Sequence, residues 1–228
     1  MTAAFAPRDQ FREPFFSVIL TTYNRAALLK RALDSLIVQT ETDWEAIIVD
    51  DGSTDNTETL IHSYLENDSR IKYVYQENAG YSLSKNTGIF LANGKFITFL
   101  DSDDEYLADH LETRKIILQS HPEIQFLYGG VKVAGNQYVP DRFNFKKIIS
   151  LSECVVGGTF FISRPLALSL NGFHDIPMGS DADFFERVKS LPGIIRETLI
   201  PTYLYHREHE NSLTNILMKQ EGFSDIYR

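Results

Sequence analysis

The chain has very little cysteine: Cys154 is the only one in 228 residues. A single thiol cannot form an intrachain disulfide or supply the several thiolates of a cysteine zinc site. The fold must therefore be stabilised by an apolar core, and 43% hydrophobic residues are enough to build one. We expect a reducing, cytoplasmic location.

Long hydrophobic runs are also missing. No apolar run approaches the ~18 residues of a membrane-spanning helix, so no transmembrane segment is expected. Residues 1–14 contain no apolar stretch and are interpreted as a loose tail instead of a secretory signal.

Positive charge is scarce, since 22 Lys and Arg face 31 Asp and Glu, for a net charge of −9. A nucleic acid polymer requires a clustered basic surface and is therefore not an expected partner. A single nucleotide remains a possible ligand, because a metal ion can bridge its phosphates to an acidic protein.

Glycine-rich phosphate loops are absent too. No Gly-x-Gly-x-x-Gly occurs, and residues 93–95 only resemble the end of a Walker A loop. Ile89 stands where that loop needs its first glycine, and Phe96 stands where Ser or Thr should follow. Phosphates must be held in another way, and a metal ion bound to carboxylates is one way.

The first hundred residues alternate between strand and helix patterns, which is typical of parallel βαβ units. Leu29, Ala32 and Leu36 recur at helical spacing, and Asp55 with Glu58 predicts a capping box. The expected strands are 15–22, 44–50, 71–76 and 95–101, and the expected helices are 25–39, 55–66 and 81–92. The predicted fold class is α/β, a three-layer α/β/α sandwich with a mostly parallel, mixed central sheet.

The second half is less regular. A helix is expected at about 109–120, and β-like runs occupy 124–128, 131–133 and 155–162, separated by glycines. This half is expected to shape a second substrate site.

Three carboxylates follow the fourth predicted strand, at Asp101, Asp103 and Asp104. In an extended chain Asp101 and Asp103 would point the same way, about 6 to 7 Å apart, and could share one divalent cation. The alternative is a polar turn that only caps the helix after it.

A second pair, Asp50 and Asp51, ends the second predicted strand. Parallel strands place their carboxyl ends at one edge, so both pairs are expected to line a common crevice. A receiver-type acidic pocket or an elaborate helix cap are the alternatives, although a receiver domain has about half this length.

Other candidate residues follow the first strand and lie near the end of the chain. Thr21, Tyr23 and Asn24 reach the same edge, where Tyr23 either stacks on a base or wedges the loop. Arg207 and His209 suit contacts to a diphosphate or to the cation, or belong to a solvated loop.

Taken in order, these segments resemble family 2 glycosyltransferases of GT-A fold, from about residue 16 to 214. The run Val-Asp-Asp-Gly-Ser at 49–53 and the run Leu-Asp-Ser-Asp-Asp at 100–104 are the most specific. The other matching segments are residues 18–24, 39–40, 54–55, 78–80, 85–88 and 92–95.

The resemblance implies a metal-dependent, inverting transferase that uses a nucleoside-diphosphate sugar, most often a UDP-sugar, with Mn²⁺ or Mg²⁺. Its acceptor would be a saccharide or a lipid-linked saccharide. Such a substrate is compatible with peripheral association at the inner face of a membrane. The implied architecture is one domain over 15–215, with a donor half at 15–104, an acceptor and catalytic half at 105–215, and a tail at 216–228.

The resemblance also assigns roles. Asp181 corresponds to the catalytic base, Asp103 to the metal ligand, and Asp104 to its support, while His209 is a further candidate for the metal. Asp101 would face the ribose or the sugar. The residues expected to bind the nucleotide sugar are Thr21, Tyr23, Asn24, Asp51, Lys85, Asp101, Asp103 and Arg207.

Two departures from the family pattern leave questions open. Ser180 precedes Asp181 where many relatives have glutamate, and Asp183 is a second candidate for the base. The chain also ends soon after Asn215, where relatives often continue, so it is either a compact enzyme or a part of one. A binding domain without turnover is the alternative function. A sugar-nucleotide pyrophosphorylase is disfavoured, because residues 20–24 contain no glycine.

Overall fold

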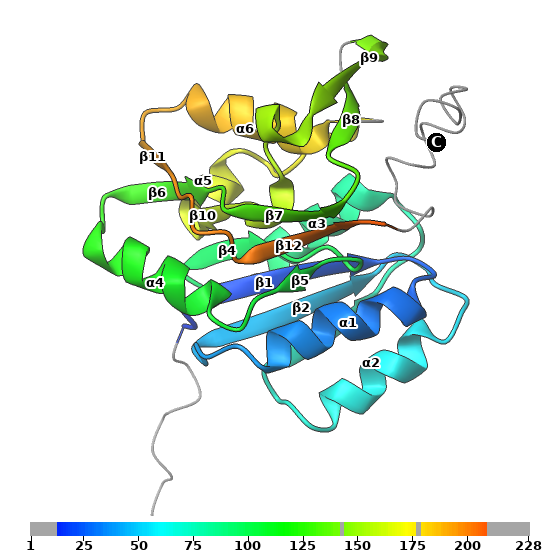
Figure 1. The fold of residues 1–228 in the computed structure, drawn as a ribbon. Helices are drawn as coiled ribbons and strands as arrows, with labels where there is room; N and C mark the ends of the chain where they lie inside the picture. Colours follow the sequence, from blue (N-terminus) through cyan, green and yellow to red (C-terminus); the bar gives the residue numbers. More distant parts are fainter. Residues whose placement is uncertain (1–12, 142–143, 177–178, 209–228) are drawn as a thin grey trace, which may run out of the picture.

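The computed structural model describes residues 13–141, 144–176 and 179–208. Its centre is a seven-stranded sheet in the order β11-β6-β10-β4-β1-β2-β3 (Figure 1). The strands β4, β1, β2 and β3 run parallel, whereas β10 is antiparallel to both β4 and β6, so the predicted mixed sheet is confirmed. The bounds are β1 Phe16–Thr22, β2 Trp44–Asp50, β3 Ile71–Tyr75, β4 Phe96–Phe99, β6 Ile124–Tyr128, β10 Phe161–Ser163 and β11 Ile194–Glu197.

Helices cover both faces of this sheet. They are α1 Ala26–Ile37, α2 Thr57–Leu65, α3 Tyr81–Leu91, α4 His110–Ser120, α5 Arg164–Ser169 and α6 Ser180–Lys189. The predicted capping box at Asp55 is wrong, because α2 begins at Thr57, after Asn56. Asp55 instead accepts hydrogen bonds from the amides of Thr57, at 3.0 Å, and Ala26, at 3.2 Å, and so joins the starts of α1 and α2.

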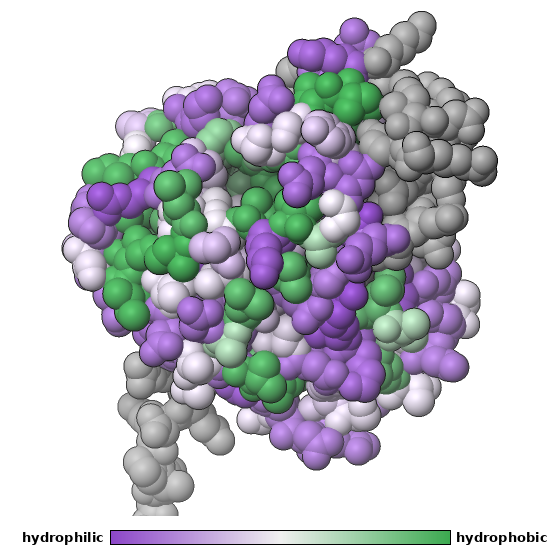
Figure 2. Space-filling model, in the orientation of Figure 1, coloured by the Kyte–Doolittle hydropathy of each residue, from purple (hydrophilic) through white to green (hydrophobic). Residues whose placement is uncertain are grey.

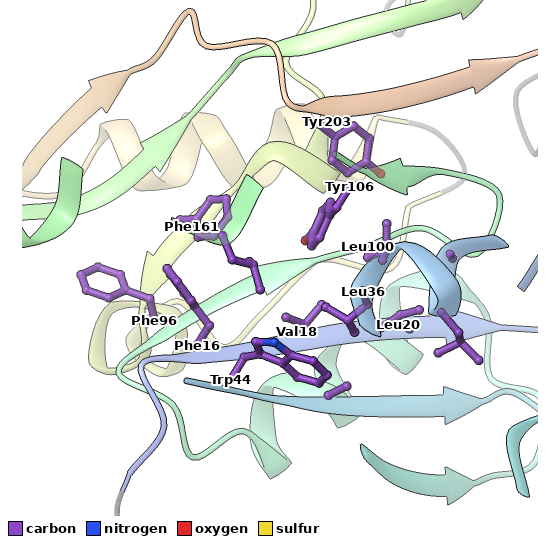
Figure 3. Packing of buried hydrophobic residues seen from close by; sticks show 14 of the residues in the cluster. Phe16, Val18, Leu20, Leu36, Trp44, Phe96, Leu100, Tyr106, Phe161 and Tyr203 are labelled. Atoms are coloured by element: carbon purple, nitrogen blue, oxygen red, sulfur yellow. The ribbon is translucent and has the colours of Figure 1, made fainter. Parts of the chain in front are cut away.

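Alternate residues of the central strands belong to two separate cores, because successive side chains of a strand point to opposite faces. Val18 and Leu20 pack with α1, α2 and α4, whereas Ile19 packs with α3, α5 and α6. Figure 3 shows the first core, which also contains Tyr106 and Tyr203. The expected three layers are confirmed.

Those two tyrosines belong to a smaller sheet of β5 Glu105–Tyr106, β12 Tyr203–Arg207 and β7 Val131–Gly135, in the order β5-β12-β7. A pair of antiparallel strands, β8 Tyr138–Asp141 and β9 Asn144–Ser150, stands beside it in Figure 1. The run expected to be a strand at 155–162 is instead a 3₁₀ turn over Gly157–Thr159 followed by β10. The two glycines of this turn lie directly against Asp181 and Tyr203, and neither position has room for a Cβ atom.

Apolar side chains gather at the left of the molecule in Figure 2, over α4 and β11. Ile116 and Leu199 line a groove of about 360 Å³ there. The groove contains none of the residues that the sequence singles out. Within the described residues, no helix has the length and hydropathy of a membrane span.

His110 makes the stability of the fold depend on pH. It is fully buried, stacked on Tyr106 at 4.0 Å between ring centroids, and its Nδ1 lies 2.9 Å from Thr202 Oγ1. Burial and then the charge of Arg114 hold the pKa of His110 well below its usual value. The unfolded chain therefore binds a proton that the folded chain does not. As the pH drops below about 6.5, the free energy of unfolding should decrease by up to about 1.4 kcal/mol per pH unit.

We expect His110→Phe to remove that part of the pH dependence, since phenylalanine can keep the stacking but cannot bind a proton. Urea unfolding of both proteins at pH 5.5 and pH 7.5 measures it. The same loss of stability on acidification in both proteins would contradict the prediction.

Candidate active site

The carboxyl ends of β1, β2 and β4 meet at one edge of the sheet, because these strands are parallel neighbours. Each is followed by residues that the sequence singles out: Tyr23 after β1, Asp51 after β2 and Asp101 after β4. The expectation of one common edge is confirmed. Thr21 is buried there, whereas Tyr23 is 49% exposed.

Asp50 does not line a crevice, contrary to expectation. Its side chain is fully buried and accepts hydrogen bonds from the Tyr73 hydroxyl, at 3.0 Å, and the Ser53 amide, at 2.8 Å. The physical reason is its position as the last residue of β2, where the neighbouring strand β3 supplies Tyr73 as a donor.

Asp51 is only 4% exposed, and its carboxylate is largely occupied by protein donors. Its Oδ1 accepts from Gln76 Nε2, at 2.8 Å, and the Ala79 amide, at 2.9 Å, while Oδ2 accepts from the Gly80 amide at 2.8 Å. A carboxylate offers about four acceptor positions. These contacts leave about one of them for a nucleotide base.

Asn24 anchors a loop. It has a positive φ of 51°, and its carboxamide oxygen accepts hydrogen bonds from the amides of Thr54, at 2.7 Å, and Asp55, at 3.3 Å. This oxygen is engaged within the protein. The expected contact between Asn24 and the donor stays a prediction.

Residues 101–104 form a turn, which we call the carboxylate turn. The amide of Asp104 donates to the carbonyl oxygen of Asp101 at 3.0 Å, and β4 has already ended at Phe99. The extended geometry expected for Asp101 and Asp103 is therefore wrong. Asp and Ser favour such turns, because their short side chains compete with the sheet for backbone hydrogen bonds.

The three carboxylates of the turn have different partners. Asp101 accepts from the Tyr81 hydroxyl at 3.0 Å, and Asp103 Oδ2 accepts from Arg25 Nη1 at 2.9 Å. Asp104 is fully buried and accepts from the Tyr203 hydroxyl, at 2.6 Å, and from an amide of β12, at 2.8 Å. Asp104 thus fastens the turn to the smaller sheet.

Negative charge is crowded in the carboxylate turn. Burial raises the pKa of Asp101, where Lys85 acts in the opposite direction and Asp181 and Asp103 add to the rise. Burial, then Asp103 and Asp101, also raise the pKa of Asp104 well above its usual value. A cation at this place would relieve the repulsion, so the donor set fits a hard divalent ion.

Lys85 connects the turn to Asp181. It is only 1% exposed, and its Nζ lies 3.4 Å from Asp101 Oδ1 and 3.7 Å from Asp181 Oδ1. Asp181 lies in the first turn of α6 and also accepts a hydrogen bond from the Gly157 amide at 3.2 Å. Two carboxylates 80 positions apart thus share one ammonium group.

Asp183 has separate partners. Its Oδ2 lies 2.9 Å from Arg187 Nε and 3.0 Å from His174 Nδ1. Two residues apart on a helix, Asp181 and Asp183 project in different directions. Of the two aspartates, only Asp181 contacts the ammonium group that also holds Asp101. Which of them is the base stays a prediction.

Arg207 ends β12 and is 3% exposed, with Nη2 at 3.5 Å from the carbonyl oxygen of Tyr138. Its expected contact with a diphosphate stays a prediction. His209 lies outside the described residues. Within the residues that the structure covers, no group of three or more His, Cys, Asp or Glu side chains is arranged to hold a metal ion.

Sequence reasoning missed Tyr81, Arg25 and Gly157. Tyr81 precedes Lys85 by one helical turn, and this spacing on a buried helix face is a signal that could have found it. Gly157 gives no such signal, because only the folded chain places it beside Asp181.

Two known proteins resemble this chain in sequence. The chain is 33% identical over 148 residues to UDP-Glc:alpha-D-GlcNAc-diphosphoundecaprenol beta-1,3-glucosyltransferase WfgD of Escherichia coli, covering 62% of this chain and 56% of that protein. It is 37% identical over 139 residues to GalNAc(5)-diNAcBac-PP-undecaprenol beta-1,3-glucosyltransferase of Campylobacter jejuni, covering 60% and 42%. The chain thus spans about half the length of these two relatives.

Two solved structures share the fold. TarS residues 1–349 of S. aureus, in complex with UDP-GlcNAc, has a TM-score of 0.74 at 23% identity, covering 87% of this chain and 60% of that one. The mannosyltransferase PcManGT of Pyrobaculum calidifontis, in complex with GDP-Man and Mn²⁺, has a TM-score of 0.67 at 21% identity, covering 87% and 58%. The expected GT-A type fold is confirmed.

The sequence pattern that defines the family described as Glycosyl transferase family 2 matches residues 17–150. These residues include all of β1 except Phe16, and the whole of β2, β4 and the carboxylate turn. The match covers more than half of the chain, and the chain belongs to glycosyl transferase family 2.

Proposed function

We propose that this protein transfers a sugar from a nucleoside-diphosphate sugar, in the first instance a UDP-sugar, to a hydroxyl group of a saccharide or lipid-linked saccharide. Its place in the family supports this proposal, as do the two relatives whose names describe glucosyl transfer and undecaprenol-linked sugars. One observation carries it. The side chains of Asp101 and Asp181, in the donor half and the acceptor half, meet within 4 Å of the same Lys85 ammonium group.

The donor half would hold the nucleotide. Tyr23 is exposed enough to stack on a base. Thr21 lies on β1, and Asp51, with its remaining acceptor position, directly follows the adjoining strand β2. Stacking of a base on an aromatic ring contributes about 1 to 3 kcal/mol. Asp101 would then receive the ribose or sugar, with Arg207 and Lys85 near the diphosphate.

Asp181 would act as the general base. Its carboxylate takes the proton from the acceptor hydroxyl, whose oxygen forms a bond to the anomeric carbon. The bond from that carbon to the phosphate oxygen breaks, and the nucleoside diphosphate leaves from the opposite face. A single displacement of this kind inverts the anomeric configuration.

A divalent ion, Mn²⁺ or Mg²⁺, fits the carboxylate turn. Asp103 would hold it, with Asp104 supporting the turn from the buried side and His209 as a further candidate. Such an ion usually takes one or two carboxylates and fills its remaining positions with water and phosphate oxygens, so a cluster of protein ligands is not required. When bound, it would neutralise the charge that develops on the departing diphosphate.

A lipid-linked acceptor would place the reaction beside a membrane. We propose a cytoplasmic protein that works at the inner face of that membrane by peripheral association. The two undecaprenol-linked relatives support this placement.

A thermal-shift panel of nucleotide sugars, each with and without Mn²⁺, tests the proposal. A donor at 100 times its dissociation constant should add about 2.7 kcal/mol to the free energy of unfolding, and the melting temperature should rise accordingly. Proton coupling at the anomeric carbon of the product then reports whether the configuration inverts. If no donor raises the melting temperature under either condition, the proposal fails and a domain without turnover becomes the better account.

A further inference from the structure

The two oxygens of the Asp181 carboxylate are held from different sides. Oδ2 accepts a hydrogen bond from the Gly157 amide at 3.2 Å, and Oδ1 lies 3.7 Å from Lys85 Nζ. Oδ1 is buried and makes no hydrogen bond within the described residues. The side chain as a whole is 27% exposed, so part of it remains accessible from solvent.

Gly157 is required here for space. A Cβ atom at this position would overlap the carboxyl carbon and Oδ1 of Asp181 and would lie 2.5 Å from Oδ2. Its φ is not in the left-handed region, so its backbone conformation would accept alanine. The carboxylate therefore packs directly against the backbone of the 3₁₀ turn, and any side chain at 157 must displace it.

The Lys85 ammonium group is enclosed by three aromatic rings. Its nitrogen lies 4.2 Å from the ring centroid of Tyr81, 5.1 Å from that of Phe99 and 5.2 Å from that of Phe173. Rings on these sides exclude water, and a cation removed from water needs close anions. Asp101 and Asp181 supply them.

We propose that Gly157 and Lys85 are positioning residues that hold the Asp181 carboxylate between a backbone amide and a buried ammonium group. The proposal rests on the proposed function, in which Asp181 is the base. The glycine fixes where the carboxylate lies, and the lysine places a positive charge 3.7 Å from its Oδ1. Lys85 then acts on the base as well as on the donor side.

A double-mutant cycle tests the role of Gly157. Gly157→Ala should lower kcat by about 10²-fold, since a displacement of about 1 Å in a reacting group costs that much. The donor KM should stay close to that of the wild type. In an Asp181→Asn background the same substitution should have almost no further effect, because its whole action passes through Asp181. An equal loss in both backgrounds, or a wild-type kcat in Gly157→Ala, would overturn the proposal.

Gly193→Ala is the matched control. It introduces the same methyl group, but the new Cβ would only meet Oε1 of Gln125 at 2.6 Å, at the end of a flexible side chain. We expect it to retain the wild-type kcat. Thermal melting of all variants shows whether the fold is intact.

Lys85→Met tests the ammonium group with a side chain of similar length. Without the positive charge, the Asp181 carboxylate loses one of its two contacts, so kcat should fall by more than the donor KM rises. Lys85→Arg should restore part of kcat. A weaker donor affinity with an unchanged kcat would show that Lys85 serves the donor alone.

A measurement without donor separates this proposal from the proposed function. The ¹³C resonance of the Asp181 carboxyl group is identified by its loss in Asp181→Asn. It should shift in Gly157→Ala and Lys85→Met and remain in place in Gly193→Ala. If the resonance shifts but the wild type neither binds nor transfers a nucleotide sugar, the proposed function fails and the positioning stands. Unshifted resonances would overturn the positioning itself.

Discussion

Replacing Asp181 with asparagine should lower the rate of sugar transfer by about 10²–10⁴-fold, the usual contribution of general base catalysis. Asparagine has nearly the same shape, but it cannot accept the proton of the acceptor hydroxyl. Donor affinity should change little, because the residues expected to hold the donor are untouched. Initial rates at saturating donor, together with calorimetric titration of the donor, measure the two effects separately.

The comparison variant is Asp183→Asn. The Asp183 carboxylate is held by Arg187 and His174, so its loss should lower the melting temperature while most of the turnover remains. A loss of turnover in Asp183→Asn with little loss in Asp181→Asn would transfer the role of base to Asp183. Wild-type turnover in both variants would refute a carboxylate base on α6.

The second large effect is expected for Asp103→Asn, which should abolish the dependence of donor binding on Mn²⁺ and lower transfer by about 10²-fold or more. Asp103 is the carboxylate of the turn assigned to the metal, and amide oxygens bind hard cations more weakly than carboxylates do. The measurement is the rise in melting temperature produced by the donor, with and without Mn²⁺, in the variant and the wild type.

Asp175→Asn serves as the control, since it changes the charge equally at an exposed aspartate in the loop before α6. It should keep the metal-dependent rise in melting temperature. A rise of wild-type size in Asp103→Asn would show that the ion is held elsewhere. Because Asp103 also accepts from Arg25 at 2.9 Å, melting without ligand must be compared first to separate lost stability from lost binding.

The regular elements of the first half could be predicted because each carries its own local signal. Apolar runs bounded by polar residues predict β1, β2, β3 and β4, and the helical spacing of Leu29, Ala32 and Leu36 predicts α1. Parallel pairing follows from the alternation of strands and helices, so the common edge with Tyr23 and Asp51 could also be foreseen.

The individual contacts at that edge could not be predicted, because they depend on donors distant in the chain. Asp51 was expected to face a ligand, yet most of its acceptor positions are occupied by Gln76 and by the amides of residues 79 and 80. The 3₁₀ turn inside the run expected to be a strand at 155–162 likewise packs against a distant residue, because Gly157 lies directly against Asp181. The periodicity of the sequence does not predict contacts between residues that lie so far apart in the chain.

The sequence by itself determined the α/β layers, the family, and the positions of the carboxylates along the chain, because composition, periodicity and motif order are local properties. The tertiary structure alone decided which carboxylates meet. Lys85 brings Asp101 and Asp181 to one ammonium group, while Asp104 turns inward to Tyr203. The physical reason is that a buried charge must find a partner in space, and chain separation places no limit on where that partner lies.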